Sequence, residues 1–238
     1  MNPFGISSAN SVPFSSGLTH PGLSRSQNAK PDGATSANPA CGLKPFQSHE
    51  SYQEVADTAL NSRPFRHAYV HTYGHALITS ETLDALVDIM RNKKVLEVGA
   101  GTGYLAHELS LRHIDIHAVD DGSWCNIPKI WKRDTEGCAL KMLPGDYDIV
   151  LMSWPNSNDF SFDVADAMKP GQMLIYEGEY RRGNTACDEF FDEVSSAHWS
   201  EETSEKLNAF HVQFDGMRDM WSVYTKEAPS AGKSTQSD

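Results

Sequence analysis

The chain has 238 residues and a formal net charge of −12. This acidic balance disfavours DNA or RNA as a substrate, because proteins that bind nucleic acid usually present a basic patch to the phosphate backbone. No apolar run reaches the roughly 18 residues of a membrane span, and the first residues lack the basic and apolar regions of a secretory signal peptide.

Composition divides the chain into three parts. Residues 1–48 are rich in Ser, Pro, Gly, Asn and Ala and show almost no periodic apolar pattern. We expect a disordered leader there, because such a segment cannot bury enough surface to offset the entropy of ordering. Residues 49–227 have the length of one domain. Residues 228–238 are predicted to form a disordered polar tail.

The cysteines indicate neither a disulfide framework nor a zinc site. Cys41, Cys125, Cys138 and Cys187 form no C-x-x-C pair, and no histidines accompany them at zinc-ligand spacing. Free thiols in a reducing compartment are expected, which favours a cytoplasmic protein. No metal ligand is predicted in the chain.

Three predicted segments precede the main motif. Apolar spacing predicts a short helix over residues 50–61, ended by Pro64. Residues 66–76 are interpreted as an extended segment with alternating Tyr and His side chains on one side. These side chains are Tyr69, His71, Tyr73 and His75. Thr79 or Ser80 can cap the helix that follows. Its predicted buried stripe comprises Leu83, Leu86, Val87 and Met90.

The rest of the chain alternates strand and helix, which predicts an α/β fold with a doubly wound, mostly parallel sheet. The predicted strands are 94–98, 114–119, a weak one at 138–142, 147–153 and 173–176. The predicted helices are 103–111, a short one at 127–132, 160–168 and 186–197. Residues 206–214 and 219–225 are predicted to form a closing hairpin around Asp215-Gly216.

The most informative stretch is VLEVGAGTGY at residues 95–104. An apolar strand runs into three glycines spaced two apart, and a second apolar strand ends in Asp120, 23 residues after Glu97. A strand, a tight glycine turn, a helix and a second strand tipped with an acid form a βαβ unit. Such a unit holds a nucleoside-type cofactor at the carboxyl ends of parallel strands.

The glycine spacing narrows the choice of cofactor. A dinucleotide-binding motif reads G-x-G-x-x-G, whereas Tyr104 stands where its third glycine would be, and no P-loop lysine follows. The pattern resembles motif I of class I S-adenosylmethionine-dependent methyltransferases. The resemblance covers about residues 66–226. It implies a Rossmann-like methyltransferase fold, a seven-stranded sheet that ends in an antiparallel hairpin.

The resemblance also implies S-adenosyl-L-methionine as the cofactor. Glu97 would lie near its ammonium group, or could instead accept hydrogen bonds from the glycine turn. Asp120, or its neighbour Asp121, would bind the ribose hydroxyls, and Trp124 would cover the adenine ring unless it packs in the core. The implied cofactor-binding residues are Glu97, Gly99, Ala100, Gly101, Thr102, Gly103, Tyr104, Asp120, Asp121, Trp124 and Ser153.

Ligands of open α/β sheets bind at the carboxyl strand ends. This rule brings together residues 97–103, 120–124, 153–156 and 177–179. The sequence SWPN at 153–156 stands where amino-methylating members carry Asp/Asn/Ser-Pro-Pro and an aromatic. It departs from that pattern because Trp154 replaces one proline and Asn156 stands in the place of the aromatic, which puts nitrogen methylation in doubt. The candidate catalytic residues are His71, Tyr73, Ser153 and Trp154, and either His71 or His75 could act as a base.

The predicted function is transfer of a methyl group to an unidentified acceptor, more readily a small molecule or a protein than a nucleic acid. One alternative is a catalytically silent domain of this fold that binds a partner protein. Another is a nicotinamide-dependent oxidoreductase, which the glycine spacing disfavours.

The leader is rich in serine and has no acidic residue before Asp32, so it resembles the secretion signals of bacterial type III effectors. That resemblance would place the protein in a host cell with a host partner, whereas an ordinary flexible tail is the alternative.

Overall fold

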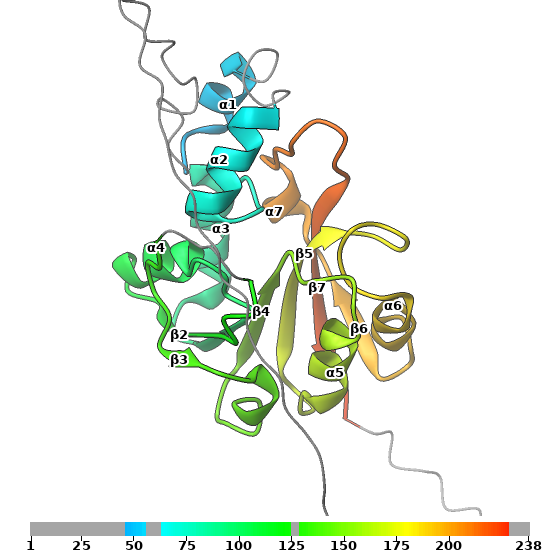
Figure 1. Ribbon diagram of the computed structural model, residues 1–238. Helices are drawn as coiled ribbons and strands as arrows, with labels where there is room; N and C mark the ends of the chain where they lie inside the picture. Colours follow the sequence, from blue (N-terminus) through cyan, green and yellow to red (C-terminus); the bar gives the residue numbers. More distant parts are fainter. Residues whose placement is uncertain (1–45, 56–62, 125–128, 229–238) are drawn as a thin grey trace, which may run out of the picture. The chain divides into compact units, whose positions relative to one another are not determined.

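The computed structural model describes residues 46–55, 63–124 and 129–228 (Figure 1). A seven-stranded sheet in the order β3-β2-β1-β4-β5-β7-β6 organises this part of the chain. The strands are β1 Lys94–Val98, β2 Asp115–Asp120, β3 Thr135–Glu136, β4 Ile149–Ser153, β5 Met173–Glu179, β6 Trp199–Glu202 and β7 Asp219–Lys226. β1 to β5 pair in parallel, whereas β7 runs antiparallel to both β5 and β6. This topology confirms the predicted α/β class and is that of the Rossmann-like methyltransferase fold.

Helices cover both faces of the sheet (Figure 1). They are α1 His49–Val55, α2 Arg63–Tyr73, α3 Ser80–Met90, α4 Tyr104–Leu111, α5 Phe160–Ala167, α6 Asp188–Val194 and α7 Glu205–Asn208. Leu96 and Val98 of β1 belong to a buried cluster with α5 and α6. Val95 belongs to the opposite cluster, with α3, α4 and α7. This division follows from the period of two along a strand, since successive side chains point to opposite faces.

A third buried cluster joins α1 and α2 to the end of the sheet at which the parallel strands terminate. Tyr52, Phe65 and Tyr69 pack there with Phe214. The N–H of Phe46 donates to the carbonyl of Ile78, so the chain entering α1 is fixed beside the chain entering α3. The hydroxyl of Thr102, in the glycine turn, donates to the carbonyl of Tyr73 at 3.0 Å. The segment before α3 is thereby held against the glycine turn.

Local signals correctly predicted several elements. Thr79 caps α3, because its hydroxyl accepts the N–H of Thr82, and Leu83, Leu86 and Met90 are buried as expected, with Val87 half-buried. β1, β2, β4 and β5 and helices α4, α5 and α6 lie at the predicted positions with shifted ends. α1, His49–Val55, begins one residue before the helix predicted over 50–61, and residues 56–61 lie outside the described residues.

The extended interpretation of residues 66–76 is wrong for residues 66–73, and His75 lies after the helix that they form. Arg63–Tyr73 is the helix α2, and Pro64 lies in its first turn, where a missing N–H removes no helical hydrogen bond. Tyr69 and Tyr73 are therefore one turn apart on a helix, with ring centroids at 5.1 Å. The alternating Tyr and His residues would lie on one side of a strand, but in a helix the Tyr and the His residues lie on two different faces. The helical arrangement buries Phe65 and Tyr69 in the third cluster.

Two predicted strands are also wrong. Residues 138–142 hold a short 3-10 helix, Ala139–Lys141, and the third strand is the two-residue β3 before it. Residues 206–214 do not form the hairpin strand, since α7 begins at Glu205 and buries Leu207, and β6 pairs with β7 instead. The helix predicted at 127–132 is not formed over 129–132, and its first residues lie outside the described residues.

The predicted leader and tail lie almost wholly outside the described residues. None of the described helices combines the length and the apolar character that crossing a membrane requires.

We expect Gly103→Ala to destabilise the fold far more than Gly171→Ala. Both glycines have positive φ, 69° and 86°, so each alanine incurs left-handed strain of about 1–2 kcal/mol. A Cβ at Gly103 would in addition overlap the backbone carbonyl of Lys132, whereas one at Gly171 meets nothing within 4 Å. Urea denaturation should therefore show that Gly103→Ala lowers the free energy of unfolding by about 2 kcal/mol or more beyond the loss in Gly171→Ala. Equal losses in the two variants would contradict this account.

Candidate functional site

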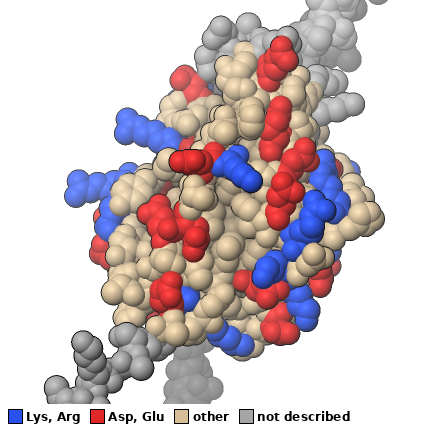
Figure 2. All heavy atoms as spheres, turned by 180° about the vertical axis from the view of Figure 1, so that it is seen from behind, with Lys and Arg blue, Asp and Glu red and all other residues tan. Residues whose placement is uncertain are grey.

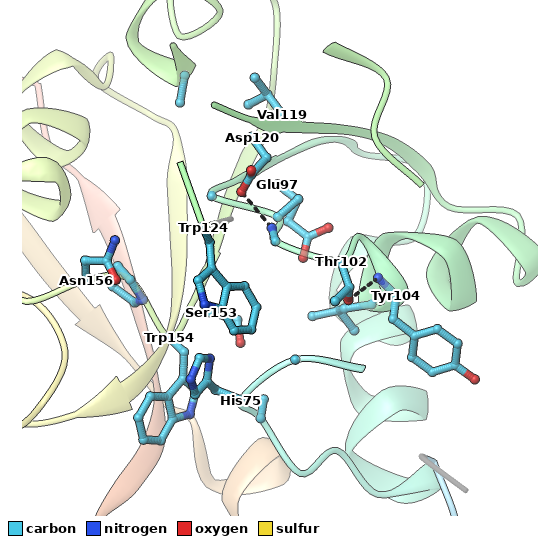
Figure 3. Close-up of a pocket in the computed structure, with 18 of the residues that line it drawn as sticks. His75, Glu97, Thr102, Tyr104, Val119, Asp120, Trp124, Ser153, Trp154 and Asn156 are labelled. Atoms are coloured by element: carbon cyan, nitrogen blue, oxygen red, sulfur yellow. Dashed lines mark hydrogen bonds between the residues drawn. The ribbon is translucent and has the colours of Figure 1, made fainter. Parts of the chain in front are cut away.

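A cavity of about 280 Å³ lies at the carboxyl ends of β1, β2 and β4 (Figure 3). The chain leaves β1 toward β2 on one side, and β4 pairs with β1 on the other, so this is the switch point at which open α/β sheets bind ligands. Most of the predicted site residues line this cavity. They are Tyr73, Glu97, Gly99, Ala100, Gly101, Thr102, Tyr104, Asp120, Asp121, Trp124, Ser153 and Trp154.

The carboxylate of Asp120 is bonded to the chain around it. Its Oδ2 accepts the N–H of Gly101 and its Oδ1 the N–H of Gly122, both at 2.8 Å. Arg133 lies 3.0 Å from Oδ1 and also donates to the carbonyl of Gly101. A ribose that binds Asp120 would therefore have to share this carboxylate with Arg133 or displace it. Arg133 was not singled out in the sequence, where nothing but its charge marks it.

The carboxylate of Glu97 is buried beside the cavity with one oxygen unpartnered. Its side chain is 4% exposed, and Oε2 has no hydrogen-bond partner among the described residues. Burial, aided by the nearby charge of Asp120, raises the pKa of Glu97 to about 8, although a hydrogen bond with the backbone of Ala106 opposes the shift. A buried polar atom without a partner is costly. A cationic ligand in the cavity would relieve that cost.

Ser153 and Trp154 are held by a second buried carboxylate. The Ser153 hydroxyl and the Trp154 indole N–H donate to the two oxygens of Glu177, at 2.8 and 3.0 Å. The backbone N–H of Trp154 donates to the carbonyl of Glu177 at 2.7 Å. Residues 177–179 were predicted at the site, and the structure places Glu177 behind the cavity wall instead. It supports the wall without lining the cavity.

Glu177 belongs to a buried cluster with Asp219 and His211, whose ligating atoms lie within 4.8 Å of one another. Burial and the neighbouring Asp219 raise the pKa of Glu177 well above its usual range. Burial would also raise the pKa of Asp219, but hydrogen bonds with His211 and Glu177 outweigh it and lower that pKa. Of the two carboxyl groups, Glu177 is therefore the one whose surroundings favour the protonated form. His211 Nε2 lies 2.8 Å from the carbonyl of Asp219, so it carries a hydrogen and its lone pair is not offered to a metal ion.

Aromatic rings form the rest of the wall. The His75 ring contacts the indoles of Trp124 and Trp154, with centroids at 5.1 and 5.4 Å. His71, predicted as catalytic, does not line the cavity. It lies on α2 with its ring 4.2 Å from that of His67. Of the two histidines considered as a base, His75 is the one at the cavity.

Gly103 is the other predicted residue that does not line the cavity. It packs against the backbone of Lys132 at the start of α4. Three acidic side chains line the cavity, Glu97, Asp120 and Asp121, and no Lys or Arg of the described residues lines it. Since Glu97 keeps its proton near pH 7, Asp120 and Asp121 supply the negative charge of the free cavity. A site of this composition favours cationic or neutral ligands over anionic ones.

Solved structures similar to this chain include methyltransferases. The CcbJ methyltransferase from Streptomyces caelestis is 14% identical, over 63% of this chain and 90% of that chain, with a TM-score of 0.41. Precorrin-6y C5,15-methyltransferase from Geobacter metallireducens is 13% identical, over 66% and 92%, with a TM-score of 0.43. A complex of a methyltransferase from Thiobacillus denitrificans with S-adenosyl-L-homocysteine is 14% identical, over 63% and 79%, with a TM-score of 0.40.

No protein-family model matches the chain, and no curated protein sequence matches it. At such identities the likeness concerns the fold alone. A function for this chain therefore has to be argued from the geometry of the cavity.

Stability should depend on pH through Glu97. Because the pKa of Glu97 is raised from 4.5 to about 8, the folded protein keeps a proton that the unfolded chain loses. The free energy of unfolding should then fall between these pH values, by at most about 1.4 kcal/mol per pH unit from this group. Glu97→Gln should remove this slope in denaturation experiments between pH 5 and 8. The exposed control Glu189→Gln should keep it, and an unchanged slope in Glu97→Gln would contradict the burial argument.

Asp120 and Arg133 should stabilise each other strongly. Their side chains are 9% and 12% exposed, so solvent screens the pair little. A double-mutant cycle with Asp120→Asn and Arg133→Gln should give a coupling energy of about 1–3 kcal/mol. The exposed pair Asp88 and Arg91, at 67% and 66% exposure, is the control and should give less than about 0.5 kcal/mol. Similar values for the two pairs would show that Asp120 is not held by Arg133.

Proposed function

We propose that this protein is an S-adenosyl-L-methionine-dependent methyltransferase whose acceptor is an uncharged small molecule or a protein side chain. The observation that carries the proposal is Glu97, a buried carboxyl group at the end of β1 that lines the cavity beside the glycine turn and whose Oε2 has no partner among the described residues. The ammonium group of the cofactor's methionine would supply that partner. Hydrogen bonds and ion pairs of this kind are the strong ones in proteins.

The remaining cavity residues fit the same cofactor. The turn at Gly99–Gly103 would let the methionine end approach closely, Asp120 would take the ribose hydroxyls, and Trp124 would lie over the adenine. When bound, the cofactor supplies an activated methyl group on a sulfonium. The chain's own task is then to hold donor and acceptor in line and to exclude water, which accounts for much of the rate in a direct displacement. Ser153 and Trp154 would face the acceptor.

A nicotinamide-dependent oxidoreductase fits the cavity less well. A dinucleotide carries a pyrophosphate, which would meet Glu97, Asp120 and Asp121 without a lysine or arginine among the described lining residues. Tyr104 also replaces the third glycine that such a site uses for close packing of the helix. The charge of the cavity therefore supports a cationic cofactor.

One observation favours the catalytically silent alternative. Asp120 already has Arg133 as a partner, and His75 already fills the space beside Trp124 and Trp154. A domain that had lost its cofactor would keep such internal contacts. In that case the protein would act by binding a partner protein, and the cavity would bind no nucleoside.

The expected partners follow from charge. On the face shown in Figure 2, Asp and Glu side chains lie beside the Lys and Arg side chains. Together with the net charge of −12 this supports an acceptor other than nucleic acid. A cytoplasmic location, and the type III secretion of the Ser-rich leader with capture of a host protein, stay proposals that rest on the sequence alone.

Calorimetric titration with S-adenosylmethionine, S-adenosylhomocysteine and NAD tests the proposal. We expect the first two to bind and NAD not to bind. Glu97→Gln removes a charge-assisted bond to the ligand ammonium, so the affinity should fall roughly tenfold to a hundredfold. Glu189→Gln, which exchanges an exposed carboxyl outside the cavity, should bind as the wild type does. Absence of binding by all three compounds would favour the silent domain, and binding of NAD alone would favour the oxidoreductase.

A further inference from the structure

The imidazole of His75 occupies a space walled by two indoles. Its ring centroid lies 5.1 Å from that of Trp124 and 5.4 Å from that of Trp154, with interplanar angles of 32° and 19°. Figure 3 shows His75 stacked on Trp154, with Trp124 above them. Offset stacking of this kind is the preferred arrangement of aromatic rings. A flat ring therefore fits this space, and in the free protein the chain supplies one.

The wall formed by Trp154 is fixed in a strained conformation. Its φ of 50° lies in the left-handed region, which bulky side chains rarely adopt. Glu177 holds it there through the indole N–H and the backbone N–H, and Glu177 is itself fully buried beside Asp219. Strain that is maintained by buried partners is concentrated at functional sites. The indole of Trp154 is therefore held at the cavity by hydrogen bonds to Glu177 that an ordinary turn does not have.

The two walls of this space lie on different sides of β1, because Trp124 belongs to the loop after β2 and its ring lies beside Gly101, whereas Trp154 belongs to the turn after β4. Asp120 ends β2 and Cys138 follows β3, so ribose and adenine would lie on the β2 and β3 side of β1. Trp154 follows β4, which pairs with β1 on its other side. The reactive methyl group of a cofactor whose methionine end lies over the glycine turn would point toward β4. The Trp154 wall is therefore on the acceptor side, and the indole of Trp124 would have the adenine on one face and the ring of the space on the other.

The chemistry of the space favours an uncharged ring. Burial lowers the pKa of His75 to about 4, helped by the charges of Arg66 and His71, so the imidazole that fills the space is neutral at pH 7. Asp120 and Asp121 on the cofactor side would disfavour an anionic acceptor in the neighbouring space. A neutral aromatic ring would replace the imidazole without a change of charge.

We propose that the space between Trp124 and Trp154 is the acceptor subsite for a planar, uncharged aromatic ring, and that His75 occupies it until the ring displaces it. The inference rests on the proposed function, because it assigns the β4 side of the cavity to the methyl acceptor. A phenyl or heteroaromatic group of a small molecule, or an aromatic side chain of a protein, has the required chemistry. The cofactor's own adenine is the competing source of such a ring.

Three small probes test the subsite. Benzyl alcohol is aromatic and uncharged, cyclohexylmethanol is its saturated counterpart, and benzoate is its anionic counterpart. Their binding is measured by ligand-observed NMR on the full chain, with and without saturating S-adenosylhomocysteine. We expect benzyl alcohol to bind under both conditions and more tightly than the other two probes, because an aromatic pair contributes about 0.5–1.5 kcal/mol beyond area burial.

The variants separate the subsite from unspecific binding. His75→Ala removes the competing ring and should tighten benzyl alcohol binding roughly threefold to tenfold, the equivalent of one aromatic pair. Trp154→Leu should weaken it by a similar factor, and so should Trp124→Leu, which leaves the bonds to Glu177 intact. His67→Ala, an exposed histidine on α2, is the matched control and should bind as the wild type does.

Each outcome decides between the sources of the ring. Loss of benzyl alcohol binding in the presence of S-adenosylhomocysteine would assign the space to adenine and overturn the acceptor subsite. Equal binding of cyclohexylmethanol, or no gain in His75→Ala, would overturn the aromatic subsite altogether. If S-adenosylhomocysteine itself does not bind, the proposed function fails, while the probe series without it still shows whether the aromatic space exists.

Discussion

One buried carboxylate organises the end of the sheet at which the cavity lies. Asp120 accepts the N–H groups of Gly101 and Gly122 and pairs with Arg133, which in turn donates to the carbonyl of Gly101. The glycine turn after β1 is thereby fixed to the end of β2. Since a buried charge needs compensation, Asp120 and Arg133 depend on each other. The ion pair of Asp120 and Arg133 therefore fixes the shape of the cavity beside the glycine turn.

The two sides of the cavity differ in chemistry. On the side of β1 and β2, Glu97 and Asp120 provide acidic groups, and one oxygen of Glu97 has no partner among the residues that the structure describes. On the side of β4, Trp154 and His75 provide aromatic surface, and the acid that holds Trp154, Glu177, lies buried behind the wall. A cationic group and an uncharged ring could therefore be bound next to each other, each in surroundings that suit it.

In the free protein, side chains of the chain itself occupy two of the places at which a ligand would bind. Arg133 takes the place of a hydroxyl donor at Asp120, and His75 takes the place of a ring between the indoles. A ligand would have to exchange these contacts for its own, so its net affinity would be the difference between the two sets. Internal partners of this kind prevent orphaned charges and open apolar space in the free protein. They also make a binding-competent site and a closed one hard to distinguish by shape alone.

The sequence by itself determined the parallel strands, the glycine turn, and the meeting of Glu97, Asp120 and Ser153 at the strand ends. Those features follow from local periodicity and from the rule that parallel strands end at one edge. The tertiary structure decided the rest. Whether residues 66–76 form a strand or a helix depended on burial of Phe65 and Tyr69 in a distant cluster. The partners Arg133 and Glu177, and the place of His75 between two indoles, arise from contacts between segments far apart in the chain. No local pattern encodes such contacts, because they exist only after the sheet has brought the segments together.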